Sequence, residues 1–353
     1  MGFLYNKLIK PLLFTDYDGL PVSGPFKVKG TAAILIDRSR ADPYEKDGAF
    51  REVPVHFFYP EQDADHPARF PLVIFSHGAF GFYKSNYSTY QELASNGYIV
   101  AAPDHPRHAF FTKNSRGKRV FVDKAFVRAV TGRGGKSDAQ QDYRLYSDWV
   151  ALRTADVSFV IDTLKAAAQS GATDDSWFVS EQEGEAVRSL PQLLDAEKIA
   201  VMGHSLGGAT AVEIGRQRSD VSAVVDLDGT MLGEYNGVEN GTLSFREDPF
   251  CVPVLEFRSW DHYNDVKESL AQGKRYPNDV LIRGAAAGFT AAIRDTKHMD
   301  FTDLPLFSPF LGKKLGKGSR DTAEAMKIVN SLVLEFLNCY LKGEGVFTVD
   351  EIY

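Results

Sequence analysis

The sequence predicts an α/β fold in which helices cover both faces of a mainly parallel, eight-stranded sheet. Short apolar runs rich in β-branched and aromatic residues alternate with longer segments whose apolar residues recur at helical spacing. This alternation is typical of a parallel sheet covered by helices. Hydrophobic residues make up 44% of the 353 residues, which is enough to bury a large core. We therefore expect a single domain over residues 1–353.

Eight of the short apolar runs are predicted to be strands. A loop of turn residues, 38–48, separates the first two, and this favours an antiparallel pair at the start of the sheet. The predicted strands are residues 31–36, 53–59, 71–76, 98–102, 198–202, 222–227, 252–257 and 289–294.

Four longer segments have the periodicity of helices that pack one face on a sheet. Three of them end just before a glycine, a common stop signal for helices: Gly97, Gly171 and Gly343. The predicted helices are residues 87–96, 145–168, 206–216 and 322–341.

Two segments do not fit this alternation. Residues 107–136 hold nine Lys or Arg against one Asp, together with four Phe, and are predicted to be a basic and aromatic insertion at the carboxyl edge of the sheet. This composition fits a solvated loop or a lid that meets lipid headgroups. Residues 171–192 are acidic and polar with one Trp, and we expect a surface insertion there.

Charge and the N-terminal residues narrow the classes of partner. The net charge of −7 gives no global attraction to nucleic acid, so no nucleic-acid partner is expected. Residues 1–14 lack the pattern of a secretory signal peptide, which predicts a cytoplasmic location. The apolar residues of this segment are expected to pack on the domain, with transient contact to a membrane surface as the alternative. Two cysteines make a disulfide framework unexpected.

The clearest chemical signal is Gly203-His204-Ser205-Leu206-Gly207, which follows a predicted strand and precedes a predicted helix. This is the G-x-S-x-G pattern of the α/β-hydrolase fold, where glycines permit a strained turn that exposes the serine hydroxyl beside a helix N-terminus. Ser205 is therefore the predicted nucleophile.

A serine hydroxyl needs a base to accept its proton and later return it to the leaving group. His298 follows the last predicted strand and precedes the last helix, as the order serine, acid, histidine requires. His262, the other histidine after Ser205, is the alternative base.

The acid that orients this histidine has three candidates. Asp228 follows the sixth predicted strand and Asp261 the seventh. Asp226 would share a face with Asp228 but lie inside the strand, where a buried carboxylate needs partners.

An oxyanion hole needs preformed N–H donors, expected from the residue after the nucleophile and from the loop after the third strand. Leu206 supplies the first donor. The loop reads FSHGAFG over residues 75–81, in which Gly78 allows a tight turn and Ala79 is the expected second donor.

Five segments together resemble the platelet-activating-factor acetylhydrolase family of α/β-hydrolases. They are FSHGAFG (75–81), ELASNGYIVAAPDH (92–105), VMGHSLGGAT (201–210), VVDLDGT (224–230) and TKHMDFTDL (296–304). The resemblance implies Ser205 as nucleophile, Asp228 as acid, His298 as base, and Ala79 with Leu206 as oxyanion donors. It favours Asp228 over Asp261. It also implies hydrolysis of short or oxidised acyl chains of phospholipids, although residues 107–136 match no family segment.

These residues predict a serine carboxylic ester hydrolase that needs no metal or cofactor and cleaves short-chain acyl esters of small molecules or lipids through an acyl-enzyme. An aromatic substrate pocket is expected near Phe80, Phe82, Tyr83 and Trp260. A lipase or polyester hydrolase of the same fold is the alternative. A binding protein without turnover fits less well, because every member of the triad has a candidate.

Overall fold

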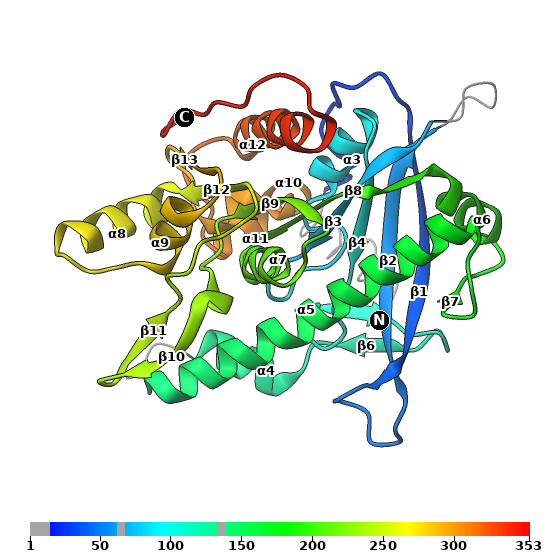
Figure 1. The fold of residues 1–353 in the computed structure, drawn as a ribbon, viewed down its shortest axis with the longest axis horizontal. Helices are drawn as coiled ribbons and strands as arrows, with labels where there is room; N and C mark the ends of the chain where they lie inside the picture. The colour runs from blue at the N-terminus through cyan, green and yellow to red at the C-terminus, as the bar shows by residue number, and fades with distance from the viewer. Residues whose placement is uncertain (1–14, 62–67, 133–137) are drawn as a thin grey trace.

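A mixed nine-stranded sheet runs through the middle of the molecule (Figure 1). The computed structural model describes residues 15–61, 68–132 and 138–353. In the order β13-β12-β9-β8-β3-β4-β2-β1-β7, the strands from β13 to β4 are parallel, whereas β2 runs antiparallel to both β4 and β1. The bounds are β1 Val28–Ala41, β2 Phe50–Pro60, β3 Phe70–Ser76, β4 Ile99–Pro103, β7 Trp177–Phe178, β8 Leu194–His204, β9 Val221–Leu227, β12 Val254–Ser259 and β13 Gly288–Ile293. All eight predicted strands are present, and the antiparallel start is confirmed.

The ninth strand, β7, corrects the prediction of eight. It pairs antiparallel with β1 at the edge of the sheet and lies within residues 171–192, which were predicted to be a surface insertion. Most of residues 171–192 are exposed or half-buried, but the segment is ordered as β7 and α6 (Gly184–Leu193), and Trp177, Val187 and Leu190 anchor it in the main core. The surrounding charged residues dominate the composition and conceal these few inward-facing positions.

Helices cover both faces of the sheet because the side chains of each central strand alternate between two cores. In β3, Leu72 and Ile74 face one core, while Val73 and Phe75 face the other. The first core is covered by α5 (Ala139–Ser170), α6, α7 (Leu206–Gln217) and α9 (Pro277–Gly284). The second is covered by α3 (Tyr87–Ser95) and α12 (Thr322–Leu337).

The predicted helices are present, with some ends displaced. Helix α5 begins at Ala139 rather than at residue 145, because Asp138 caps it by accepting a hydrogen bond from the N–H of Gln140. Helix α12 gives way to one π-helical turn, Asn338–Lys342, which ends at Gly343 as predicted. The polar first turns of α5 carry little periodicity, so the sequence pattern alone missed them.

Residues 107–132 of the basic insertion form a hairpin, β5 (Phe111–Lys113) with β6 (Arg119–Phe121), followed by α4 (Lys124–Thr131). The hairpin is tied to the domain by Glu52, which accepts hydrogen bonds from the N–H and hydroxyl of Ser115 at 2.7 Å. Helix α4 buries Phe126 against Trp149 of α5. Residues 133–136, like the predicted packing of residues 1–14, lie outside the described residues.

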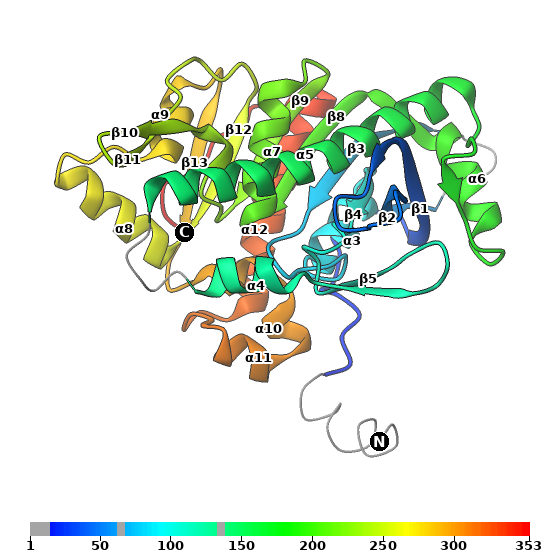
Figure 2. The same ribbon diagram turned by 90° about the horizontal axis from the view of Figure 1, so that it is seen from below.

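The remaining elements surround the carboxyl ends of β9, β12 and β13 (Figure 2). They are β10 (Tyr235–Glu239), β11 (Thr242–Phe245), α8 (Trp260–Ala271), α10 (Leu304–Phe307), α11 (Pro309–Lys314) and two short 3₁₀ turns, Leu232–Glu234 and His298–Phe301. Over the described part of the chain, none of the helices is both long enough and apolar enough to cross a bilayer.

Candidate active site

Ser205 lies at the sharp turn between β8 and α7, with φ 56° and ψ −122°. This conformation is strained for a residue with a side chain. The turn needs glycine on both sides: a Cβ on Gly207 would lie 1.9 Å from the carbonyl oxygen of Ser76, and one on Gly203 would lie 2.4 Å from the backbone of Gly207. The strand, turn and helix expected around G-x-S-x-G are therefore present, and Ser205 lines a cavity.

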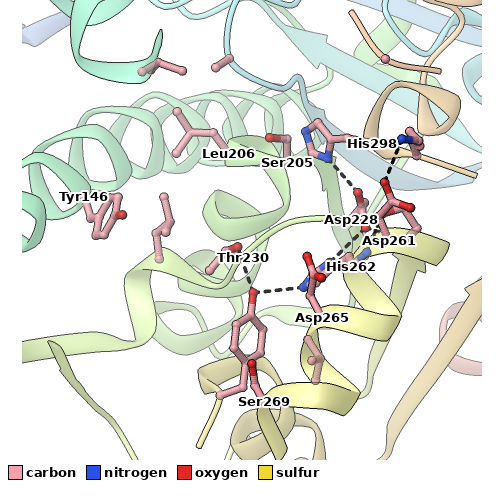
Figure 3. A pocket seen from close by; sticks show the side chains of 18 of the residues that line it. Tyr146, Ser205, Leu206, Asp228, Thr230, Asp261, His262, Asp265, Ser269 and His298 are labelled. Carbon is pink, nitrogen blue, oxygen red and sulfur yellow. Dashed lines mark hydrogen bonds and ion pairs between the residues drawn. The ribbon is translucent and has the colours of Figure 1, made fainter. Parts of the chain in front are cut away.

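Asp228 and His298 meet beside this serine. Asp228 directly follows β9, and its Oδ2 lies 2.8 Å from Nδ1 of His298 in the turn after β13. Figure 3 shows the His298 ring between Ser205 and Asp228. Since Nδ1 then carries the proton donated to the carboxylate, a neutral His298 has its lone pair on Nε2.

The Asp228 side chain is buried and remains ionised. Burial raises the pKa of this carboxyl, but hydrogen bonds from His262 and His298 outweigh burial and hold its pKa well below the usual range. A carboxylate in this state can orient an imidazole and stabilise the cation that forms when the ring takes up a proton.

His204, the residue before Ser205, supports the segment that carries His298. Its Nε2 lies 3.1 Å from the carbonyl oxygen of His298, and the two rings are 4.5 Å apart. Burial and the nearby His298 lower the pKa of His204 to about 3. His204 is therefore a neutral hydrogen-bond donor rather than a second base.

The other candidate acids have different partners. Asp261 forms an ion pair with Lys297 at 3.2 Å and is 58% exposed. Asp226 is buried below the serine, where its Oδ1 accepts a hydrogen bond from the N–H of Gly229. Burial and the neighbouring Glu256 and Asp228 raise the pKa of Asp226 well above its ordinary value. The structure therefore brings Asp228, and neither of these two, to His298.

The predicted oxyanion donors also lie at the cavity. Ala79 and Leu206 both line it, and Leu206 is the first residue of α7. Among the described residues, the structure records no acceptor for the N–H of either one. Two backbone N–H groups are thus left beside Ser205 for an oxygen atom of a ligand.

The loop that carries Ala79 is held from behind by two side chains. The guanidinium of Arg153 donates to the carbonyl oxygens of His77 and, at 3.3 Å, of Gly78. His77 Nδ1 donates to the same Gly78 oxygen at 2.7 Å, because Nε2 of that ring accepts from the N–H of His105. In a trans peptide the C=O and the following N–H point in opposite directions. Holding the Gly78 carbonyl therefore fixes the direction of the Ala79 N–H.

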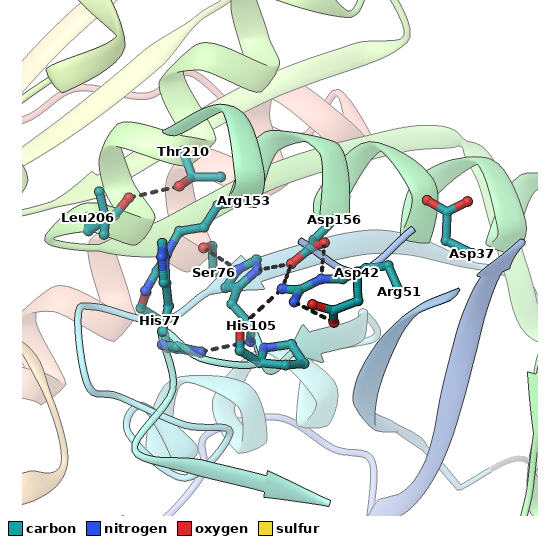
Figure 4. A network of polar contacts seen from close by, with 12 residues as sticks. Asp37, Asp42, Arg51, Ser76, His77, His105, Arg153, Asp156, Leu206 and Thr210 are labelled. Carbon is teal, nitrogen blue, oxygen red and sulfur yellow. Dashed lines mark hydrogen bonds and ion pairs between the residues drawn. The ribbon is translucent and has the colours of Figure 1, made fainter. Parts of the chain in front are cut away.

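Behind this loop lies a buried ionic network that no sequence pattern predicted (Figure 4). Asp156 of α5 accepts two hydrogen bonds from Arg51 of β2 and one from Nδ1 of His105 at 3.0 Å. Nε2 of His105 then accepts from the hydroxyl of Ser76 at 3.0 Å. Burial alone raises the pKa of Asp156, but Arg51 and His105 outweigh burial and lower it. The network joins α5, β2 and the end of β3, and so keeps the Ala79 loop in place.

The cavity that contains Ser205 has a volume of about 700 Å³ and aromatic walls. Tyr146 and Tyr235 stack with ring centres 5.7 Å apart, and Trp149 and Tyr276 add further aromatic surface. Asp261, Asp265 and Lys297 place charges on its lining.

The aromatic residues predicted for this pocket lie elsewhere and do not belong to its described lining. Phe80 packs on Phe126, and Tyr83 stacks on His56 with ring centres 3.5 Å apart. Phe82 lines a separate small pocket with Phe307, and Trp260 stacks on Tyr263. The prediction was wrong because it relied on closeness to the motifs along the chain, whereas the actual walls come from α4, α5, α8 and the segment after β9.

A model of the family described as platelet-activating factor acetylhydrolase, isoform II, matches residues 53–348. The platelet-activating factor acetylhydrolase of Cavia porcellus is 26% identical over 294 residues, which cover 77% of this chain and 58% of that protein. The Gallus gallus protein of the same name is 25% identical over 289 residues, with 77% and 62% covered. The chain therefore spans about three fifths of the length of these relatives.

Two further proteins share a more distant likeness. Cutinase 1 of Thermobifida cellulosilytica is 23% identical over 171 residues, covering 43% of this chain and 65% of the cutinase. The solved structure of a ferulic acid esterase from Streptomyces cinnamoneus aligns with a TM-score of 0.62 and 22% identity, covering 92% of this chain and 93% of the esterase chain. At that identity the likeness concerns the fold, and it confirms the predicted α/β-hydrolase fold.

Proposed function

Because the chain belongs to the platelet-activating factor acetylhydrolase family, we propose that it is a serine carboxylic ester hydrolase that works through an acyl-enzyme. The observation that carries this proposal is the 2.8 Å contact between His298 Nδ1 and Asp228 Oδ2 beside Ser205. Ser205 is the nucleophile, His298 the general base and acid, and Asp228 the carboxylate that orients His298.

In the first half of the reaction, His298 Nε2 takes the proton of Ser205 as the serine oxygen attacks the ester carbonyl. The carbonyl oxygen becomes an oxyanion and accepts hydrogen bonds from the N–H groups of Ala79 and Leu206. The positive end of the α7 dipole favours the same charge. His298 then returns its proton to the leaving alcohol, and the acyl group stays on Ser205.

In the second half, a water molecule takes the place of the alcohol. His298 removes a proton from the water molecule as the water oxygen attacks the acyl carbonyl. The tetrahedral intermediate is again stabilised by the two backbone N–H groups. Its collapse releases the carboxylic acid and gives the proton back to Ser205, so no metal or cofactor takes part in the cycle.

We propose short acyl esters as substrates, including short acyl groups at the sn-2 position of phospholipids. The names of the acetylhydrolase relatives support a short acyl group. The cavity supports the same class, because its apolar and aromatic walls suit a short acyl chain while Asp261, Asp265 and Lys297 suit a polar remainder of the ester.

We also propose a transient contact of the basic hairpin with a membrane surface. Phe110 and Phe121 are each 55% exposed beside the cations of β5 and β6. Exposed aromatic rings next to basic residues suit the boundary between lipid headgroups and acyl chains.

One substrate panel tests the reaction and the surface contact together. We expect p-nitrophenyl acetate and butyrate to be cleaved in the presence of a chelator, and kcat/KM to fall at least about tenfold for octanoate and longer chains. A preference for long chains would favour the lipase or polyester hydrolase alternative.

With short-chain phosphatidylcholine in anionic vesicles, turnover should fall between roughly 0.05 and 0.5 M salt while cleavage of the soluble acetate barely changes. Salt-independent turnover on vesicles would argue against the surface contact.

The loop behind Ala79 leads to a further prediction. Arg153→Met removes the donors that hold the His77 and Gly78 carbonyls. We expect kcat to fall about 10- to 100-fold with little change in KM, because losing one oxyanion donor outright costs about 10² to 10³. Arg216→Met is the matched control, because it removes a nearly buried arginine paired with Glu234 away from this loop. If both variants lose thermal stability equally and neither lowers kcat per titrated active site, Arg153 has only a structural role.

A further inference from the structure

The carboxylate of Asp228 binds two imidazoles. His298 occupies Oδ2, while Nδ1 of His262, in the first turn of α8, lies 3.0 Å from Oδ1. The N–H of Ser259 also donates to Oδ1, at 2.6 Å. A triad carboxylate needs only one histidine to orient the base, so His262 requires a separate explanation.

His262 is connected in turn to the wall of the cavity. Its Nε2 lies 3.0 Å from the hydroxyl of Tyr276, and that hydroxyl lies 3.2 Å from Oγ1 of Thr230 (Figure 3). When His262 is neutral, one arrangement of protons satisfies every hydrogen bond in this series. Thr230 donates to Tyr276, Tyr276 donates to Nε2 of His262, and Nδ1 of His262 donates to Asp228. A charged His262 is satisfied equally well, because Nε2–H then donates to Tyr276 and Tyr276 donates to Thr230. The site therefore accepts His262 in either protonation state.

Building on the proposed ester hydrolase function, we propose that His262 and Tyr276 are positioning residues that hold the Asp228 carboxylate toward His298, and that the charge on His262 sets the lower pH limit of activity.

The positioning follows from the geometry of a carboxylate. Asp228 can turn about its Cβ–Cγ bond unless both oxygens are held. Ser259 and His262 hold Oδ1 from two directions, so Oδ2 stays directed at His298. Tyr276 fixes the plane of the His262 ring from its far side, and α9 anchors Tyr276, which is its N-cap residue. The support is independent of Ser205 and the oxyanion loop.

The charge effect follows from the surroundings of His262. Burial lowers the pKa of His262, but the hydrogen bond and charge of Asp228, helped by Glu256, outweigh burial and the opposing Arg258, so the pKa is raised. The titratable and charged groups around the ring come from β9 and its end, β12, the segment before α9, the turn after β13 and α8 itself. They are Asp226, Asp228, Glu256, Arg258, Tyr276, Lys297, His298, Asp261 and Asp265.

Two imidazoles that bind the two oxygens of one carboxylate interact through their charges. While His262 carries a proton, its positive charge opposes a second proton on His298, because both rings share the same negative charge. A base that resists protonation stays active at lower pH. Removing the charge of His262 should therefore move the acid limb of the pH–rate profile to higher pH. Removing its hydrogen bond to Asp228 should lower the plateau value of kcat.

Two substitutions at this position separate the effects. His262→Asn places an amide N–H near the position of Nδ1 but cannot become charged, whereas His262→Phe removes both the donor and the charge. We expect both variants to shift the midpoint of the acid limb of kcat/KM upward by about half a pH unit or more. We expect His262→Phe to lower the plateau kcat about tenfold and His262→Asn to recover most of that loss. Tyr276→Phe should lower the plateau by about two- to threefold.

Lys267→Gln is the control for charge, because it removes an exposed cation from the same helix without touching Asp228. It should leave the acid limb in place. Active sites are counted in every variant by titration with a fluorophosphonate. If His262→Asn and His262→Phe lose kcat equally and neither shifts the acid limb, or if both behave as the wild type, the proposal is overturned.

A readout that needs no turnover separates this inference from the proposed function. In Ser205→Ala protein, histidine ring signals can be followed by NMR against pH. The His298 signal should titrate at higher pH when His262→Asn is added, whatever reaction the wild type catalyses. An unchanged His298 titration would overturn the coupling, whereas an absence of ester hydrolysis by the wild type would overturn only the function.

Discussion

Replacing Ser205 with alanine should lower kcat for a short acyl ester by about 10⁴ to 10⁶, by analogy with other serine triads. The Ser205 hydroxyl forms the acyl-enzyme, and the adjacent His298 acts by taking its proton. What remains after its removal is stabilisation of the oxyanion formed by direct attack of water. The measurement is steady-state hydrolysis of p-nitrophenyl acetate, with the loss expected in kcat.

The same serine should be the site of covalent inactivation. A fluorophosphonate reacts with an activated hydroxyl by displacement of fluoride, so peptide mass spectrometry should find the label on Ser205 and activity should fall in proportion. Ser331→Ala, which removes an exposed hydroxyl on α12, is the matched control and should be labelled and active as the wild type. Full activity in Ser205→Ala, or a label elsewhere, would exclude the proposed nucleophile.

Asp228→Asn should lower kcat by about 10³ to 10⁴. The neutral amide no longer stabilises the His298 cation, and its NH₂ group disfavours the tautomer in which Nδ1 donates. His262 would lose its acceptor in the same substitution. The measurement is again kcat per titrated active site, and the protein should remain folded because the side chain keeps its size.

Asp261→Asn is the matched control, since Asp261 follows the neighbouring strand and lines the same cavity. Its partner is Lys297, and an ion pair with both members about half exposed contributes only about 0 to 1 kcal/mol. We therefore expect less than about a fivefold change in kcat. If Asp261→Asn proved the more damaging of the two, the acid would have to be reassigned to the strand β12 position.

Much of the fold could be predicted from local patterns. Strand β3 and the second half of β8 are buried on both faces, so each appears in the sequence as a nearly continuous hydrophobic segment. Strand β7 has only two residues and draws its stability from pairing with β1, which no local pattern reveals. The hairpin and helix of the basic insertion were not predicted for a related reason. The hydrogen bond from Ser115 to Glu52 and the packing of Phe126 on Trp149, which hold them in place, join distant parts of the chain.

The residues of the candidate site fall into the same two groups, those that a local sequence pattern predicts and those that depend on tertiary packing. The residues that depend on chain direction were placed correctly at strand ends, because Ser205, Asp228 and His298 follow β8, β9 and β13 as predicted. The residues that depend on packing were not predicted. Nothing near Arg153 in the sequence indicates that its guanidinium reaches the carbonyls of His77 and Gly78, some 75 residues earlier. The pocket residues were misassigned on the same basis.

The sequence by itself determined the fold class and the strand ends at which Ser205, Asp228 and His298 stand, because these follow from hydrophobic periodicity and from glycines that a tight turn requires. The family came from the resemblance of five sequence segments. Only the tertiary structure decided that Asp228 binds both His298 and His262, that Arg153 holds the loop of Ala79, and that Tyr146, Trp149, Tyr235 and Tyr276 form the cavity wall. Those arrangements are made by side chains that meet across different elements. The distances and hydrogen bonds between these side chains are set by how the sheet and helices pack. Such long-range contacts produce no periodic pattern in the sequence.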